Sequence, residues 1–156
     1  HIAEGYLATG DWRRAMDHAE VSLAAESDLN SGDHPRVANT LSLFARCLTE
    51  RGDLISAIAQ FERAVAMHQR TLGVTRWTTH QTSDLALWSC DAMVETLGGL
   101  GHAFETQLLF DRALEAHDFA MFVAETQFGP EDLRSVNAMI DLGDSLGALG
   151  DRRRQI

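Results

Sequence analysis

Residues 41–73, LSLFARCLTERGDLISAIAQFERAVAMHQRTLG, decide the fold of this chain. Apolar residues recur at helical spacing on both sides of Gly52: Leu41, Ala45 and Leu48 before it, and Ala57, Phe61 and Ala64 after it. The small residues in this pattern let two helices approach closely around the large Phe61. The stretch therefore predicts a helical hairpin with a tight turn at Gly52.

The same spacing returns when Gly10, Gly52, Gly101 and Gly150 are aligned as turn glycines. Seven residues before these glycines stand Ala3, Ala45, Val94 and Gly143, and four residues before them stand Tyr6, Leu48, Leu97 and Leu146. Nine residues after the first three stand Ala19, Phe61 and Phe110, and twelve after stand Ser22, Ala64 and Ala113. Three of the first four residues are small and all of the second four are large, which indicates an internal repeat.

The hairpin resembles a tetratricopeptide repeat, and more narrowly the longer repeats of kinesin light chains. The link Gly32-Asp33-His34-Pro35-Arg36-Val37-Ala38 is similar to that family's loop into its next helix. The resemblance covers nearly the whole chain. It implies an all-α fold, a right-handed α-solenoid of antiparallel helix hairpins, in which the first helix of each hairpin lines a concave groove.

We expect residues 1–156 to form a single solenoid segment. The expected units are a partial repeat at about 1–31, repeats at 32–73 and 74–129, and a partial repeat at 130–156. Half repeats at both ends cannot cap such an array, because their apolar faces are left uncovered. We therefore expect a fragment of a larger protein, whose remaining parts hold the effector function.

Helices are expected at about 11–29, 35–51, 53–72, 84–100 and 102–128, and a last hairpin that stops just past Asp151. Gly73 to Gly101 spans 28 residues, whereas Gly32 to Gly52 spans 20, so about seven residues are added around Thr75 to His80. The sequence leaves open whether 74–83 is a loop or a helix extension. Both helices of the hairpin at 84–128 are expected to be longer than their counterparts.

Composition limits the class of protein. With 156 residues and 45% hydrophobic residues, the chain suits a soluble globular domain and carries no membrane-spanning stretch. Its 23 acidic residues outnumber 13 basic residues, all arginine, and the net charge of −10 repels phosphate backbones. Direct nucleic-acid binding is thus not expected, and basic partners are favoured. Two cysteines make no disulfide framework, which favours the cytoplasm.

Motifs for catalysis or metal binding are weak. Gly143-Asp144-Ser145-Leu146-Gly147 resembles an esterase signature, but such a serine needs a strand-to-helix elbow and this segment lies in an expected helix. His68 and His117 each stand 16 residues after a turn glycine, which indicates equivalent packing positions. H-E-x-x-H and C-x-x-C are absent. We expect no enzyme, no cofactor and no metal, and we expect Cys47 and Cys90 to be buried.

Partner-binding residues are expected 13, 10 and 6 positions before each turn glycine, where the resemblance implies a groove-facing side chain. They are Asn39, Ser42 and Arg46; Trp88, Asp91 and Glu95; and Asn137, Ile140 and Asp144, with Asp141 as a further acid. Kinesin-light-chain repeats often place paired asparagines here, which this sequence lacks. A basic segment with Trp88 as its aromatic contact fits better than a peptide held by an asparagine ladder. The alternative is that these charges only keep the face solvated.

The expected function is a protein-interaction scaffold or sensor module of a regulatory protein. Long repeats without lysine look similar to modules at the carboxyl end of actinobacterial regulators. The partner is either a separate protein or an effector domain of the same polypeptide, and a homo-oligomer stays open. Two alternatives remain: a small signal molecule in an apolar pocket around Trp88, or a structural spacer or oligomer contact.

Overall fold

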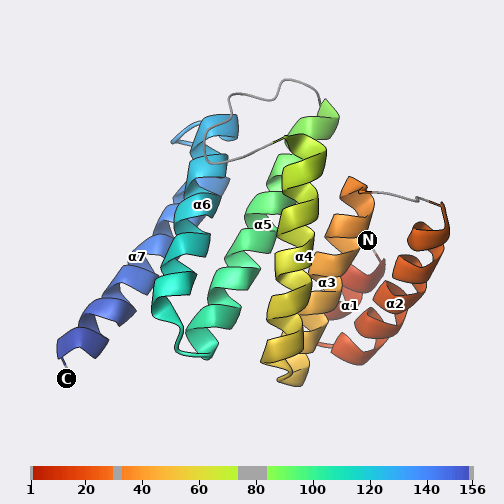
Figure 1. Cartoon of the computed structure of the whole chain (residues 1–156), viewed down its shortest axis with the longest axis horizontal. Coiled ribbons are helices and arrows are strands. Elements are labelled where there is room, and N and C mark those ends of the chain that lie inside the picture. The colour runs from red at the N-terminus through yellow and green to blue at the C-terminus, as the bar shows by residue number, and fades with distance from the viewer. Residues whose placement is uncertain (1, 30–32, 74–83, 155–156) are drawn as a thin grey trace. The chain divides into compact units, whose positions relative to one another are not determined.

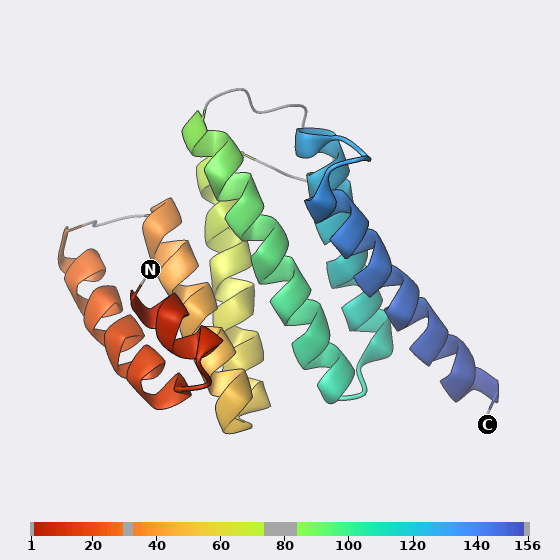
Figure 2. The same ribbon diagram turned by 180° about the vertical axis from the view of Figure 1, so that it is seen from behind.

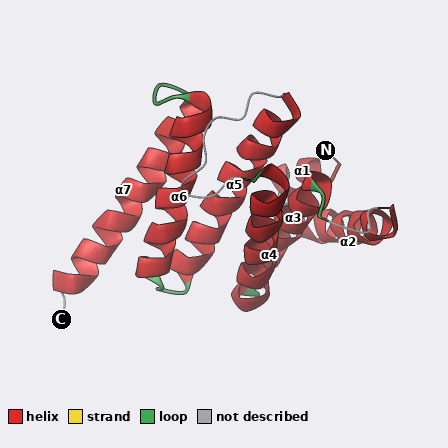
Figure 3. Cartoon of the chain, turned by 45° about the horizontal axis from the view of Figure 1, so that its top comes forward, coloured by secondary structure: helices red, strands yellow, loops and turns green. Residues whose placement is uncertain are grey.

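The computed structural model describes residues 2–29, 33–73 and 84–154, and over these residues it contains seven α-helices and no strand (Figures 1 and 3). The expected all-α fold of helix hairpins is therefore confirmed. The chain forms two compact units, His1–Thr71 and Leu72–Ile156. The segment 74–83, which includes Trp77, lies outside the described residues. The question of whether it forms a loop or a helix extension is therefore left as the sequence leaves it.

The first unit consists of four helices. They are α1 (Ile2–Ala8), α2 (Trp12–Leu29), α3 (Pro35–Arg51) and α4 (Leu54–Leu72), close to the expected bounds. Helix α2 packs against both α1 and α3. Val37 and Leu41 of α3 meet Ala64 of α4 in a buried cluster, and the partly buried Leu23 and Met67 pack against it. One apolar core thus joins α2, α3 and α4.

Local sequence explains both ends of α3. Pro35 occupies its first turn, where a missing N–H leaves no bond unmade, and His34 Nδ1 accepts a 3.1 Å hydrogen bond from Arg36 N. Gly52 ends the helix with φ of +85°, a left-handed conformation that glycine adopts without a Cβ penalty. Its N–H donates to Thr49 O at 2.9 Å, and Asp53 N donates to Leu48 O at 2.9 Å.

The second unit consists of three helices, α5 (Asp84–Thr106), α6 (Phe110–Phe128) and α7 (Leu133–Arg154). Helix α6 packs against both α5 and α7, and α5 also contacts α7 directly. Figure 2 shows α5 and α7 on the side of α6 that faces the viewer. The first helices of two successive hairpins are therefore neighbours.

The expected turns at Gly101 and Gly150 are wrong. Gly101 lies inside α5 and Gly150 lies inside α7. The turn between α5 and α6 is at Leu108, whose N–H donates to Glu105 O at 2.8 Å while Leu109 N donates to Phe104 O at 2.9 Å. This is the same bond pattern as at Gly52, so Leu108 takes the place of the turn glycine. The glycine pattern misses this turn because the residue in the left-handed conformation is a leucine, with φ of +59°.

The corrected register changes which positions are equivalent. His117 lies nine residues after Leu108, as Phe61 lies nine residues after Gly52, so His117 and His68 are not equivalent. Gly101 takes the place of Ala45, seven residues before the turn. Helix α6 has 19 residues, like α4, so the expectation that it is longer than its counterpart is wrong. Helix α5, with 23 residues against 17 in α3, is longer, as expected.

We expect Leu108→Gly to stabilise the protein by about 1 kcal/mol, because glycine adopts a positive φ without the cost that a leucine side chain carries. Leu108 is 60% exposed, so little buried contact is lost. The free energy of unfolding from urea titration measures the gain. Gln107→Gly in the same turn is the control, since Gln107 has no positive φ and its replacement should be destabilising. A loss of stability in Leu108→Gly would contradict the prediction.

Candidate functional site

The residues expected to bind a partner fall on three helices in both units. Asn39, Ser42 and Arg46 lie on α3 of the first unit. Arg46 is exposed, whereas Ser42 is buried, and the Asn39 Oδ1 atom is buried without a hydrogen-bond partner. Of these three residues, Arg46 is the most exposed and Asn39 is half-buried.

The other expected residues lie on α5 and α7 of the second unit. On α5, Trp88 is 45% exposed and Glu95 is exposed, whereas Asp91 is half-buried. Asp91 Oδ1 lies 3.4 Å from Arg134 Nη1 of α7. Arg134 also pairs with Asp132, at 2.7 Å, and its guanidinium carbon lies 3.5 Å from the ring centroid of Phe128. Asp91 therefore has a basic partner within the unit.

On α7, Asn137 and Asp144 are exposed, and Ile140 is 55% exposed. Asp141 is half-buried, and its Oδ1 lies 3.9 Å from His102 Nε2 of α5. This contact and the Asp91–Arg134 pair place α5 and α7 side by side. The expected residues of the second unit thus lie on two neighbouring helices.

Counted from the turn at Leu108, the positions 13, 10 and 6 residues earlier are Glu95, Gly98 and His102. Glu95 stays in the set and His102 joins it. Trp88 and Asp91 remain near the same face of α5, because the shift of seven residues is about two helical turns.

A polar cluster that the sequence analysis missed joins all three helices of the second unit. Glu105 of α5 accepts a short hydrogen bond from the buried Ser145 of α7. The oxygen that accepts this bond, Oε1, also lies 3.6 Å from Nε2 of the fully buried His117 of α6. The other oxygen, Oε2, lies 3.1 Å from His102 Nδ1. The donor atoms of His102, Glu105 and His117 all lie within 4.8 Å of one another, which is close enough to share a metal ion.

The charges of this cluster follow from its surroundings. Burial raises the pKa of Glu105, but the hydrogen bond from Ser145 and the nearby imidazoles outweigh that effect and hold the pKa below its ordinary value. Burial lowers the pKa of His117 more than the neighbouring Glu105 raises it. A carboxylate and a neutral imidazole therefore face each other at neutral pH.

The cluster has a signal in the sequence. His102 and Glu105 are three residues apart, so they share one face of a helix. This spacing is not recognised from the sequence because a turn is expected at Gly101. That turn would put His102 at the start of a helix. The third member, His117, is brought to them only by the packing of α6.

The segment Gly143–Gly147 lies within α7, as expected. Ser145 is buried with no exposed surface, and it donates to Glu105. A helical serine in this position lacks the strand-to-helix elbow that a serine nucleophile of this motif needs. Its hydrogen bond to Glu105 makes it part of the polar cluster.

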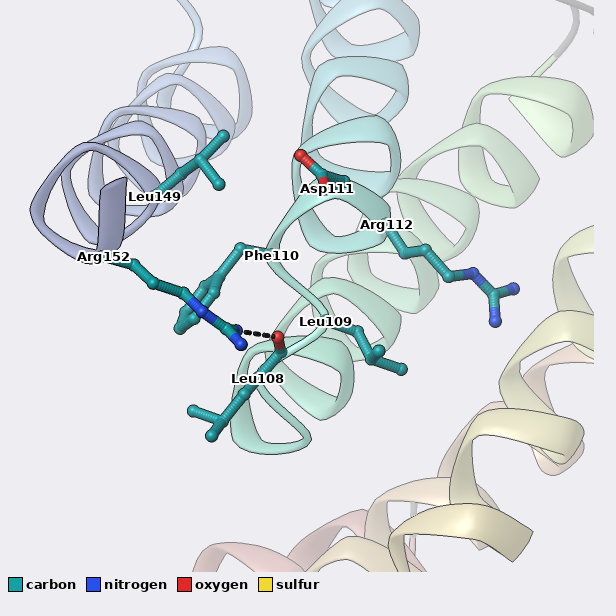
Figure 4. A pocket seen from close by; sticks show the side chains of 7 residues that line it. All are labelled: Leu108, Leu109, Phe110, Asp111, Arg112, Leu149 and Arg152. Atoms are coloured by element: carbon teal, nitrogen blue, oxygen red, sulfur yellow. Dashed lines mark hydrogen bonds between the residues drawn. The ribbon is translucent and has the colours of Figure 1, made fainter. Parts of the chain in front are cut away.

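A surface hollow of about 390 Å³ lies at the turn between α5 and α6 (Figure 4). Its lining comes from Leu108 to Arg112 and from Leu149 and Arg152 of α7. Arg152 Nη1 donates a 2.7 Å hydrogen bond to Leu108 O, and its guanidinium carbon lies 5.5 Å from the Phe110 ring centroid. Trp88 does not line this hollow. The alternative function, binding of a small signal molecule, predicts an apolar pocket around Trp88. This hollow lies elsewhere and does not support that function.

Cys47 and Cys90 are free thiols with no exposed surface, as expected, and burial raises the pKa of each to about 11. They are therefore thiols rather than nucleophilic thiolates at neutral pH. In the part of the chain that the structure describes, none of the helices has the length and apolar character needed to cross a bilayer.

Comparison with known proteins points to one family. Residues 1–70 match the family model described as tetratricopeptide repeat, a match that lies within the first unit. No curated protein matches the chain. Two crystal structures of nearly identical TPR-like repeats, described as kinesin light chain from Podosopora anserina, are similar to it, and one of the two carries a single substitution. Each is 15% identical with a TM-score of 0.45, and the match covers 98% of this chain and 86% or 85% of theirs.

Proposed function

We propose, from the match of residues 1–70 to the tetratricopeptide-repeat family, that this chain is a regulatory module that binds a basic segment of a protein partner. The repeats of this family generally mediate protein–protein interaction, and the family is one of non-catalytic scaffolds. Stacked helical repeats present extended surfaces that suit this work. The partner is a separate protein or an effector domain of the same polypeptide.

One observation carries the choice of a basic partner. Helix α5 exposes Trp88 and Glu95, and the neighbouring α7 exposes Asp144. An exposed tryptophan supplies a large contact area, and the exposed acidic side chains elsewhere on these two helices attract arginine and lysine. The net charge of −10 adds long-range attraction for the same partner.

The acidic residues on α5 and α7 differ in how far their side chains are exposed to a partner. Asp91 is half-buried and pairs with Arg134. Asp141 lies near His102 and is half-buried. Glu95 and Asp144 are exposed and therefore are the residues to vary first.

We expect the double variant Glu95→Gln/Asp144→Asn to bind the partner about tenfold or more weakly than the parent chain, because two attractive charges are removed from the contact. The partner is captured from native lysate on the parent chain, and its affinity for both proteins is then measured. Trp88→Ala should weaken the same complex. Raising the salt concentration should weaken the parent complex more than that of the variant.

The matched control is Asp17→Asn/Glu20→Gln, which removes two exposed acids from α2 of the first unit. It changes the net charge by the same amount and should leave affinity almost unchanged. Equal weakening by both double variants would mean that only net charge matters. Equal binding by parent and Glu95→Gln/Asp144→Asn would refute this site and turn attention to the exposed apolar residues of α7, such as Leu133, Met139 and Ile140.

A further inference from the structure

A histidine stands in a core position of the second unit where the first unit has a phenylalanine. The turns at Gly52 and Leu108 have the same hydrogen bonds, and Phe61 and His117 each follow their turn by nine residues. Phe61 is 1% exposed and His117 is not exposed at all. A core that packs with an apolar ring in one hairpin therefore has a polar ring in the other.

Helix α5 has a glycine, Gly101, where it meets the His117 ring. A Cβ atom on Gly101 would lie 2.3 Å from His117 Nε2 and 2.4 Å from Cε1. The equivalent position in the first unit is Ala45, which carries a Cβ atom. The imidazole of His117 lies directly against the α5 backbone, in a space that only glycine leaves open.

The buried imidazole is not satisfied by hydrogen bonds. Neither Nδ1 nor Nε2 of His117 has a hydrogen-bond partner, and Nε2 lies 3.6 Å from Glu105 Oε1. Buried polar groups without a partner are rare in native proteins, and coordination of an ion is one way in which such a group is satisfied. His117 Nε2 lies near the Glu105 carboxylate, which could bind the same ion.

Two further ligand types surround the same point. His102 Nδ1 lies 3.1 Å from Glu105 Oε2, and the rings of His102 and His117 approach edge to face with centroids 5.3 Å apart. In the first unit the positions of His102, Glu105 and His117 hold Arg46, Thr49 and Phe61. The potential ligand set is therefore particular to the second hairpin and is not a general feature of the repeat.

We propose that His102, Glu105 and His117 bind a divalent transition-metal ion, with Zn²⁺ as the best fit. Ligand bonds of about 2.0–2.2 Å in a tetrahedral zinc site place neighbouring donor atoms about 3.3–3.6 Å apart. His102 Nδ1 lies 3.1 Å from Glu105 Oε2 and His117 Nε2 lies 3.6 Å from Glu105 Oε1, so each imidazole lies near this spacing from one of the two carboxylate oxygens. Two imidazoles with one carboxylate favour zinc, cobalt or nickel over magnesium or calcium, which prefer oxygen ligands.

The surroundings complete the site. Ser145 of α7 donates to Glu105 and orients the carboxylate, as partners of metal ligands commonly do. Asp141 Oδ1 lies 3.9 Å from His102 Nε2 and can orient that ring or supply a further oxygen. The His102 side chain is 59% exposed, which leaves the ion a route from solvent. A bound ion would link α5 to α6 directly and α7 through these partners.

The test is a titration of the metal-free chain with Co²⁺, followed by Zn²⁺ competition. Tetrahedral Co²⁺ with nitrogen and oxygen ligands absorbs visible light, so the spectrum reports the geometry of binding. We expect one Co²⁺ per chain with such a spectrum, displaced by Zn²⁺. In a thermal melt, Zn²⁺ at 100 times its Kd should raise Tm by about 5 °C or more.

His102→Ala is the principal variant, because the exposed His102 side chain can be removed without disturbing the core. It should weaken Co²⁺ binding about 100-fold or more and abolish the rise in Tm with Zn²⁺. Glu105→Gln, which keeps an oxygen to accept from Ser145, should do the same. His18→Ala, which removes an exposed histidine of α2, is the control and should bind like the parent chain.

The outcomes separate the proposal from adventitious binding. Binding that His102→Ala and Glu105→Gln leave unchanged would place the ion on other histidines and overturn the proposal. Failure of the parent chain to bind Co²⁺ or Zn²⁺ at micromolar concentrations would overturn it as well. Circular dichroism of both variants shows whether they fold, so that a loss of binding is attributed to the ligand and not to the fold.

Discussion

Gly101→Ala is expected to destabilise the second unit by about 3 kcal/mol or more, although alanine is a better helix former than glycine. The added Cβ would lie 2.3, 2.4 and 2.7 Å from three atoms of the His117 ring. That ring is fully buried between helices and cannot move aside without shifting α6. The steric cost therefore outweighs the gain of about 1 kcal/mol in helix propensity.

Thermal and urea unfolding measure this loss, and two controls identify its cause. Gly147→Ala lies on an exposed part of α7 where a Cβ meets no atom within 4 Å, so it should stabilise by up to about 1 kcal/mol. Gly101→Ala/His117→Ala removes the ring that the new methyl group would meet, and should be less unstable than the two single changes predict. Stability of Gly101→Ala at or above that of the parent chain would contradict the packing that the structure describes.

Acid is expected to destabilise the first unit through His68. Burial lowers the pKa of His68 to about 4 from an ordinary value of 6.5, because neither buried ring nitrogen has a partner that would stabilise the charge. Above pH 6.5 the imidazole is neutral in both the folded and the unfolded chain. Between pH 6.5 and 4 only the unfolded chain takes up the proton, so the free energy of unfolding falls as the pH falls. The full loss is about 3 kcal/mol.

His68→Leu should remove this part of the pH dependence, since leucine fills a similar volume and has no proton to bind. Urea titrations at about pH 7 and about pH 4.5 should show that the variant loses about 2–3 kcal/mol less than the parent chain over this interval. His18→Leu, which replaces an exposed histidine of α2, is the control. Equal slopes for parent and His68→Leu would show that His68 accepts a proton in the folded state.

The helices of the first unit could be predicted from the sequence because their signals are local. Apolar spacing marks α3 and α4, Pro35 marks a helix start, and Gly52 and Gly73 mark helix ends with φ of +85° and +62°. Each of these signals acts within a few residues of chain. The family match over residues 1–70 confirms that this repeat could be recognised from its sequence.

The second unit misleads the same reasoning for a physical reason. Gly98, Gly99 and Gly101 weaken a helix in isolation and so predict a turn, yet α5 continues through them to Thr106. The contact that requires Gly101 comes from His117, 16 residues later, on another helix. The observed turn carries Leu108 in a left-handed conformation, held by the Arg152 side chain from α7. No local rule predicts either feature.

The sequence by itself determined the all-α fold, the acidic character and the burial of both cysteines, because composition and helical periodicity express these properties directly. It also carried the resemblance to tetratricopeptide repeats, which the family model matches over residues 1–70. The partner-binding residues on α5 and α7 were chosen from the sequence, and their role stays a proposal. Tertiary structure alone decided the register of the second hairpin and the meeting of His102, Glu105 and His117. Those side chains come from two helices, and the distance between their donor atoms depends on how closely α6 packs against Gly101.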